Sequence, residues 1–241
     1  MYKRQDVASW NKKYQELTSN VAFRTSATFN SKVPAVAAWL RQGELEAASN
    51  NRKNWNADWF LASLPQVRKL TRESAPEKFI PLLTQLCAES GLSIVVLPTP
   101  KGCTASGATR FINRNHPVLM LSARHLSDDH FWFTFFHEAG HLVLHSQNRL
   151  FIEYDSSPDS KEELEANTFA QDLLIPDEHR EEFLKLKRDV RQVARFARKI
   201  GISPGIVVGQ LQHQEVLEKQ YLNKAKKRFQ WDGSRLVAKK R

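Results

Sequence analysis

The sequence predicts an α+β fold in which a small mixed β-sheet packs on a helical bundle, followed by a C-terminal helical module. Apolar residues recur at helical spacing through most of residues 33–90. A short β-branched strand and a hairpin follow within residues 93–122, and helical patterns return after residue 127. A chain of 241 residues can bury a core for one compact domain with a small helical appendage. We place the domain boundaries at 1–32, 33–184 and 185–241.

Three helices are expected in the N-terminal half of the chain. The first covers residues 33–48, and the second covers 57–72 with Asn56 as its N-cap. The third covers residues 76–90 and ends at Gly91, a residue type that often follows a helix. Residues 1–32 are expected to be a linker remnant that contributes little to the packed fold.

The strands are predicted from short β-branched or alternating segments. Ser93–Leu97 reads as one strand, and residues 108–113 with 118–122 read as a hairpin around Arg114–Pro117. Residues 150–154 form a further short extended segment. Few strands and many helices are consistent with the α+β class.

The pattern His137-Glu138-x-x-His141 lies in an apolar helical segment that begins after Ser127, a suitable N-cap. Histidines four residues apart on a helix share a face, so both imidazoles can bind one metal ion. Glu138 is rotated about 100° away and suits a general base that takes a proton from water. Zinc fits two imidazoles, a carboxylate and an open fourth position. A third histidine six residues on is excluded, because that position is Gln147.

The third ligand should therefore be a carboxylate from a second helix, predicted over residues 160–175 with a serine cap. Glu162, Glu163 and Glu165 compete for this role. Glu165 borders the apolar stripe, whereas Glu162 lies in the first turn, where an exposed acid is favoured by the helix dipole. The pattern favours Glu165 without excluding the other two.

Several motifs together resemble the ImmA/IrrE family of zinc metallo-endopeptidases, and they span most of residues 21–231. Beyond His137–His141, they are Ser106–Phe111, Asp129–Thr134, Glu165–Pro176, Ile202–Leu211 and Arg228–Trp231. The resemblance implies a zincin-like peptidase domain over residues 33–184, Zn²⁺ as the cofactor and Glu138 as the catalytic base. In that family the glutamate before the Ala-Asn pair completes the metal site, which maps onto Glu165 and makes His137, His141 and Glu165 the expected ligands.

The same resemblance implies a specific protein substrate, typically a helix-turn-helix repressor or antitoxin, in a stress-response, mobile-element or toxin–antitoxin locus. An extended substrate is expected to pair with an exposed strand edge. We assign that edge to Ser106, Gly107, Ala108, Thr109 and Arg110. The alternative is a regulatory or sensor module of a toxin–antitoxin or transcriptional regulator, which uses the same fold to bind a partner or ligand without cleaving it.

Longer members of the resembling subfamily carry an N-terminal helix-turn-helix domain of the antitoxin or repressor type. Met1–Gln5 resembles the translation of a sequencing-library adapter, so we expect a reading frame truncated before residue 6. DNA contact is accordingly expected through that missing domain and not through this fragment alone. The chain shows no signal peptide and no membrane-spanning apolar run, which predicts a cytoplasmic protein without membrane contact.

The net charge of +10 comes from the C-terminal quarter of the chain, because residues 185–241 hold 16 Lys and Arg against four acids. Residues 190–200 and 204–214 form two helices around Gly201 with Ser203 as a cap, a spacing similar to a helix-turn-helix unit. The second helix begins with apolar residues, whereas base readout requires polar ones. We therefore predict a packing module with solvated basic helix faces and a frayed tail at Lys239–Arg241.

Overall fold

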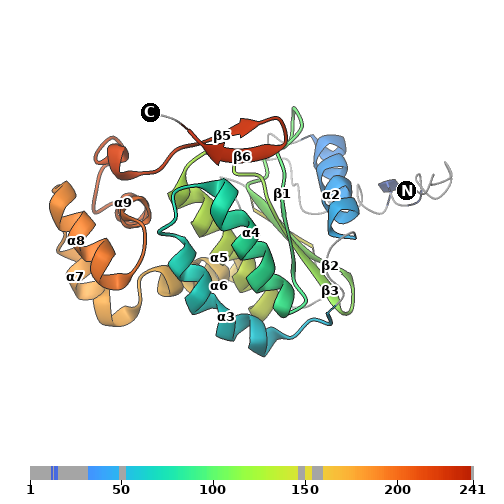
Figure 1. Cartoon of the computed structure of the whole chain (residues 1–241), viewed down its shortest axis with the longest axis horizontal. Coiled ribbons are helices and arrows are strands. Elements are labelled where there is room, and N and C mark those ends of the chain that lie inside the picture. The colour runs from blue at the N-terminus through green and yellow to red at the C-terminus, as the bar shows by residue number, and fades with distance from the viewer. Residues whose placement is uncertain are drawn as a thin grey trace.

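The computed structural model has the predicted α+β architecture (Figure 1). It describes residues 12, 14, 15, 32–48, 53–145, 150–153 and 160–239. The predicted linker at residues 1–32 lies outside this part of the chain except at four positions. None of the described helices is long and apolar enough to cross a membrane.

The described helices, in chain order, are α2 (Val33–Ala47), α3 (Ala57–Leu70), α4 (Pro76–Glu89), α5 (Asp128–Leu144), α6 (Lys161–Leu174), α7 (Arg180–Leu184), α8 (Val190–Ile200) and α9 (Pro204–His213). The strands are β1 (Ser93–Val96), β2 (Gly107–Asn113), β3 (His116–Leu121), β4 (Phe151–Glu153), β5 (Phe229–Asp232) and β6 (Arg235–Ala238). Short 3-10 turns lie at Asp177–His179 and Asn223–Ala225. The elements expected before residue 176 are present within about two residues of their predicted bounds.

The main sheet is mixed, as predicted, with strand order β1-β3-β2-β4. β1 runs parallel to β3, whereas β2 runs antiparallel to both β3 and β4. α2 covers one face of the sheet, and α5 packs on β2 and β3 from the other face (Figure 1). The helix that carries the His-Glu-x-x-His pattern therefore lies directly on the sheet.

Aromatic residues bury α5 on almost every side. This helix has 17 residues, and Trp132, Phe135 and Phe136 are completely inaccessible to solvent. Removal of one such ring to alanine costs roughly 3–5 kcal/mol in typical cores. The helix also contacts α3, α6 and α9, so its polar residues are enclosed by a rigid, water-poor environment.

The C-terminal module packs on α5 through its second helix. Gly201 adopts a left-handed conformation (φ 77°) that ends α8, and the Ser203 hydroxyl caps α9 by accepting a hydrogen bond from the Gly205 amide. Most of α9 is buried, including Ile206 and Val207. One hydrophobic cluster includes residues of α5, α8 and α9. This burial agrees with the predicted packing module.

Between the helical module and the expected tail, β5 and β6 form an antiparallel hairpin on α4 that the sequence analysis did not assign (Figure 1). Lys240 and Arg241 of the expected tail lie outside the described residues. Phe229 is buried against Phe79 and Phe131, with ring centroids 5.9 and 6.3 Å away. Asp232 pairs with Arg235, so the two-residue turn of this hairpin is Gly233-Ser234. A Gly-Ser pair between segments of alternating apolar residues is a hairpin signal that our interpretation overlooked.

Asp128 joins the beginning of α5 to the C-terminal module. Its carboxylate accepts hydrogen bonds from the Ser203 hydroxyl at 2.5 Å and from the Lys227 amide at 2.9 Å. A Cβ atom at Gly205 would lie 2.4 Å from the Asp128 Oδ1 atom, so this approach requires a glycine. Burial raises the pKa of Asp128 from 3.8 to about 6, although these hydrogen bonds oppose the shift.

Asp128→Asn should change the pH dependence of stability. Because the folded state raises this pKa to about 6, the protonated carboxyl stabilises the fold below pH ~4, and that contribution is lost as the pH rises through 6. Asparagine does not titrate. The unfolding free energy of Asp128→Asn minus that of the parent should therefore rise by about 2–3 kcal/mol between pH ~4 and ~7. Urea unfolding at several pH values measures this difference.

Asp232→Asn, at an exposed position, is the control for loss of one carboxylate. The same pH response of the unfolding free energy in both variants would contradict the assignment of the raised pKa to Asp128.

Candidate metal centre

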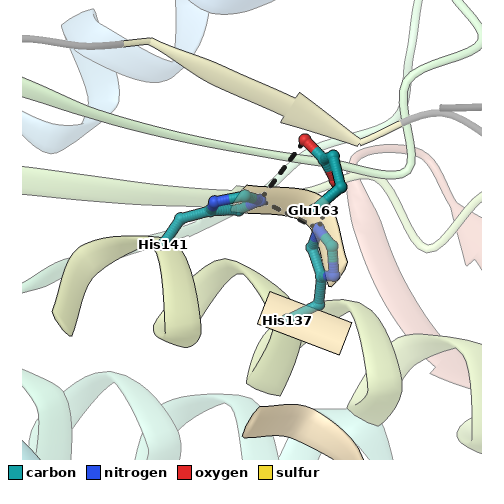
Figure 2. Close-up of side chains that lie close together, drawn as sticks. All are labelled: His137, His141 and Glu163. Carbon is teal, nitrogen blue, oxygen red and sulfur yellow. Dashed lines mark hydrogen bonds and ion pairs between the residues drawn. The ribbon is translucent and has the colours of Figure 1, made fainter. Parts of the chain in front are cut away.

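His137 and His141 project from the same face of α5, one helical turn apart (Figure 2). Each residue is only 2% exposed, and their Nε2 atoms lie 3.0 Å apart. Two imidazole lone pairs at this separation repel each other unless a proton or a cation lies between them. The pair is therefore arranged to share a positively charged partner.

Glu163, from the first turn of α6, completes the cluster. Its Oε2 atom lies 3.1 Å from the Nε2 atom of His137, and its Oε1 atom lies 3.6 Å from that of His141. Figure 2 shows the carboxylate beside both imidazoles. Among the described residues, these three form the single group of His, Cys, Asp or Glu side chains with metal-ligand spacing.

The expectation that Glu165 completes this cluster is wrong. The Glu165 side chain is 42% exposed, and its carboxylate contacts His145 and Lys161 instead of His137 or His141. Two residues along a helix correspond to a rotation of about 200°, so Glu163 and Glu165 face nearly opposite directions.

The phase of α6 explains why Glu163 faces the histidines. The residues of α6 that are buried lie at positions 163, 166, 170 and 174, which is one stripe at helical spacing. α5 and α6 approach closely at Gly140, where a Cβ atom would lie 3.1 Å from the Ala166 Cα atom. Small residues at this contact allow a carboxylate one turn earlier on α6 to reach the histidines.

The three side chains fit a zinc ion. Ligand atoms at 2.0–2.1 Å from a tetrahedral zinc ion lie about 3.3 Å from one another. The two Nε2 atoms lie 3.0 Å apart, and the nearest Glu163 oxygen lies 3.1 Å from that of His137 and 3.6 Å from that of His141. These separations bracket the value expected around zinc. Two imidazoles and one carboxylate also match the donor set of catalytic zinc sites, with a fourth position left for water.

Each histidine of the cluster has a second partner at its other ring nitrogen. The His137 Nδ1–H group donates to the Oδ1 atom of Asn167 on α6 at 2.9 Å. The His141 Nδ1 atom lies 3.0 Å from the Nδ1 atom of His145, the residue at the C-terminal end of α5. Such contacts fix the ring orientation and leave Nε2 available as a ligand atom.

Glu138 is completely buried between α5 and β2. A Cβ atom at Gly107 would lie 2.7 Å from Glu138 Oε1, so the absence of a side chain at residue 107 leaves room for this carboxylate. Neither carboxylate oxygen accepts a hydrogen bond from the described residues. Burial raises the pKa of Glu138 well above its ordinary value, and nearby Glu153 and Glu163 add to this effect, whereas His137 and Thr109 oppose it. An unsatisfied carboxylate beside the two histidines is available for proton transfer.

The charges of the cluster depend strongly on one another. Burial by itself lowers the pKa of His137, but Glu153, Glu163 and Glu138 together raise it to about 9. Burial and the neighbouring positive His137 lower the pKa of His141 to about 4, despite the contact with Glu163. Burial raises the pKa of Glu163, but its contacts with both imidazoles outweigh this and lower it to about 2. Three carboxylates around one charged imidazole favour a bound cation.

The predicted substrate edge, Ser106–Arg110, is not exposed. β2 lies between β3 and β4, and the register pairs Gly107, Ala108 and Thr109 with residues of both neighbours. Arg110 forms an ion pair at 2.8 Å with Glu44 of α2, on the opposite side of the sheet. The expectation of an exposed edge is wrong because β4, three residues long, was not recognised as the partner that covers β2. Of the five residues, Ser106 lines the cleft beside the cluster. Among the described strands, β4 is the outermost on this side.

A cleft of about 650 Å³ extends from the cluster to the C-terminal module. α5 forms one wall, with Phe133 and His137, and α9 forms another, with Ile206 and His213. Exposed cationic residues from the following loop, including Arg228, also line it. The C-terminal module therefore contributes to the cleft, a role that the sequence analysis did not assign.

Asn167 and His145 were also missed as parts of the site. Asn167 stands in the Ala-Asn pair that carried the family resemblance, and His145 lies one further turn after His141. The spacing of His145 was the available signal, because residues at i and i+4 on a helix are neighbours.

The comparisons with known proteins agree with this geometry. No curated protein matches the chain significantly. A sequence model of the family described as Peptidase M78, IrrE N-terminal-like domain, matches residues 89–212. The match covers just over half of the chain and includes α5, α6, the four-stranded sheet and all but the last residue of α9. It confirms the ImmA/IrrE resemblance, and the chain therefore belongs to the Peptidase M78 family of zinc metallopeptidases.

Proposed function

We propose that this protein is a zinc-dependent endopeptidase that cleaves a specific regulatory protein. The observation that supports this proposal best is the convergence of His137, His141 and Glu163 beside the buried Glu138. Membership of a metallopeptidase family supports the same conclusion.

His137, His141 and Glu163 would hold the ion through two Nε2 atoms and one carboxylate. Zinc bound there supplies Lewis-acid chemistry, because it polarises a scissile carbonyl and makes water more acidic. Asn167 keeps the His137 ring oriented through Nδ1. Burial of the whole cluster limits competition by bulk water.

Glu138 serves as the general base and then as the general acid. It accepts a proton from the attacking water as the water oxygen bonds to the scissile carbonyl carbon. When the C–N bond breaks, the same carboxyl group gives that proton to the leaving amine nitrogen. Its enclosure by Gly107 and α5 holds it beside the two histidines without a competing hydrogen bond from the described residues.

The substrate is an extended peptide segment that pairs with β4 and occupies the cleft. β4 is the outermost described strand of the sheet and lies next to the cluster, since the Phe151 and His141 rings stack 4.1 Å apart. An extended backbone readily adds to a strand edge. α9 forms the wall of the cleft opposite α5.

We infer from the family resemblance that the substrate is a helix-turn-helix repressor or antitoxin. Cleavage of such a protein would change the expression of a stress-response, mobile-element or toxin–antitoxin locus.

Purified protein should contain one zinc ion per chain, and Glu163→Ala should lose it. Loss of the carboxylate leaves two ligands, which is insufficient for a stable catalytic zinc site. Elemental analysis by mass spectrometry after zinc loading measures the stoichiometry. Glu162→Ala, at the adjacent residue outside the cluster, is the matched control and should retain the ion. Full zinc content in Glu163→Ala would disprove the ligand assignment.

Glu138→Gln should retain zinc but lose cleavage by about 10²–10⁴-fold, because an amide of the same shape cannot accept a proton from water. The assay co-expresses the chain with helix-turn-helix repressors and antitoxins and identifies fragments by mass spectrometry. Rates are then measured on the substrate found, with zinc determined in the same samples. Glu181→Gln, on the exposed side of α7, is the control.

Undiminished cleavage by Glu138→Gln would reject the peptidase mechanism. If the parent protein instead binds a regulator without cutting it, and Glu138→Gln binds equally well, the fold serves as a regulatory binding module.

A further inference from the structure

A chain of polar contacts leads from the metal centre to the protein surface through His145 and Glu165. The His141 Nδ1 atom lies 3.0 Å from the His145 Nδ1 atom, and the His145 Nε2 atom lies 3.1 Å from the Glu165 Oε2 atom. The His145 side chain is 6% exposed, whereas that of Glu165 is 42% exposed. The contacts therefore join a buried ring to a carboxylate in water.

The hydrogen-bond donors and acceptors along the contacts from His141 through His145 to Glu165 are mutually consistent. A carboxylate can only accept, so the His145 Nε2–H group must donate to Glu165. The Nδ1 atom of a neutral His145 then carries a lone pair and accepts from the Nδ1–H group of His141. This leaves the lone pair of His141 Nε2 directed at Glu163 and His137, which is the orientation that a metal ligand requires.

Local backbone geometry places the His145 ring beside that of His141, with the ring centroids 5.1 Å apart. His145 is the C-cap of α5, and its backbone N–H still donates to the His141 carbonyl at 3.2 Å. Phe151 of β4 stacks on the His141 ring at 4.1 Å with an interplanar angle of 15°. Stacking fixes the plane of the ring, but it does not select which nitrogen faces the cluster.

We infer that His145 and Glu165 are positioning residues that fix the tautomer and orientation of His141 for metal binding. This inference rests on the proposed zinc site. It also explains a glutamate two residues after the ligand Glu163: Glu165 acts on the centre through His145 and not as a ligand. Asn167 holds His137 in the same way, so both histidines have an orienting partner.

The test is the zinc affinity of the full chain, measured by competition with a chromogenic chelator. His145→Phe preserves an aromatic ring beside Phe151 but accepts and donates no hydrogen bond. Loss of an orienting partner of a metal-bound histidine typically lowers metal affinity by about 10–100-fold, and we expect a decrease of that size. His145→Gln can both accept and donate, and should recover part of the lost affinity.

Glu165→Ala should weaken zinc binding less than His145→Phe does, and far less than Glu163→Ala. Because Glu165 is on the surface, its replacement cannot fail through misfolding of the core. Lys161→Ala is the matched control, since Lys161 contacts the Glu165 carboxylate at 3.5 Å and is 87% exposed. Long-range ¹H–¹⁵N NMR of the metal-free protein supplies a second readout and should show His141 protonated at Nδ1 and His145 at Nε2.

Several outcomes would overturn this role. Zinc binding within twofold of the parent by both His145→Phe and Glu165→Ala is one such outcome, and protonation of His141 at Nε2 is another. If Glu165→Ala lost zinc as completely as Glu163→Ala, Glu165 would be a ligand and not a positioning residue. A parent protein that binds no zinc would refute the proposed function itself. This result is distinguishable from the outcomes above, because in each of those the parent protein binds zinc.

Discussion

The close approach of α5 and α6 at Gly140 and Ala166 is the contact on which the site depends. A Cβ atom on Gly140 would lie 3.1 Å from the Ala166 Cα atom, so the two helices meet through their smallest residues. The cluster is arranged around this point. His137 and His141 lie three residues before and one residue after Gly140, and α6 supplies Glu163 and Asn167 at the same offsets from Ala166. Residues at these offsets flank the contact on each helix, which brings the four side chains together.

α5 is held at both ends by polar contacts from distant parts of the chain. At its N-terminus, the Asp128 carboxylate binds the Ser203 hydroxyl at the start of α9. At its C-terminus, His145 contacts Glu165 of α6. The aromatic residues between these ends fix its depth in the core but are less directional than hydrogen bonds. The metal-binding face is therefore oriented by the termini of the helix, and the first of these contacts also fixes α9 as a wall of the cleft.

The sequence predicted the fold class, the sheet and the two histidines, because these follow from local periodicity and spacing. The third carboxylate did not follow from them. Glu163 and Glu165 both border the apolar stripe of α6, and the choice between them depends on which face packs on α5, which is a tertiary property. The same reason applies to the expected edge at residues 106–110, since pairing with β4 joins segments about 40 residues apart. The hairpin after residue 228 could have been predicted from its Gly233-Ser234 turn.

Glu138 and Glu163 show how one residue type acquires two roles. Both are buried, which by itself raises the pKa of each carboxyl. Glu163 contacts two imidazoles, and these contacts lower its pKa to about 2, so it remains an anion suited to a metal ligand. For Glu138, burial outweighs the opposing effects of His137 and Thr109, so its pKa stays raised and the carboxylate can take up a proton. Burial of these acids opposes folding, whereas a cation at the centre would offset that cost. In the proposed zinc-bound form, metal binding and folding therefore stabilise each other.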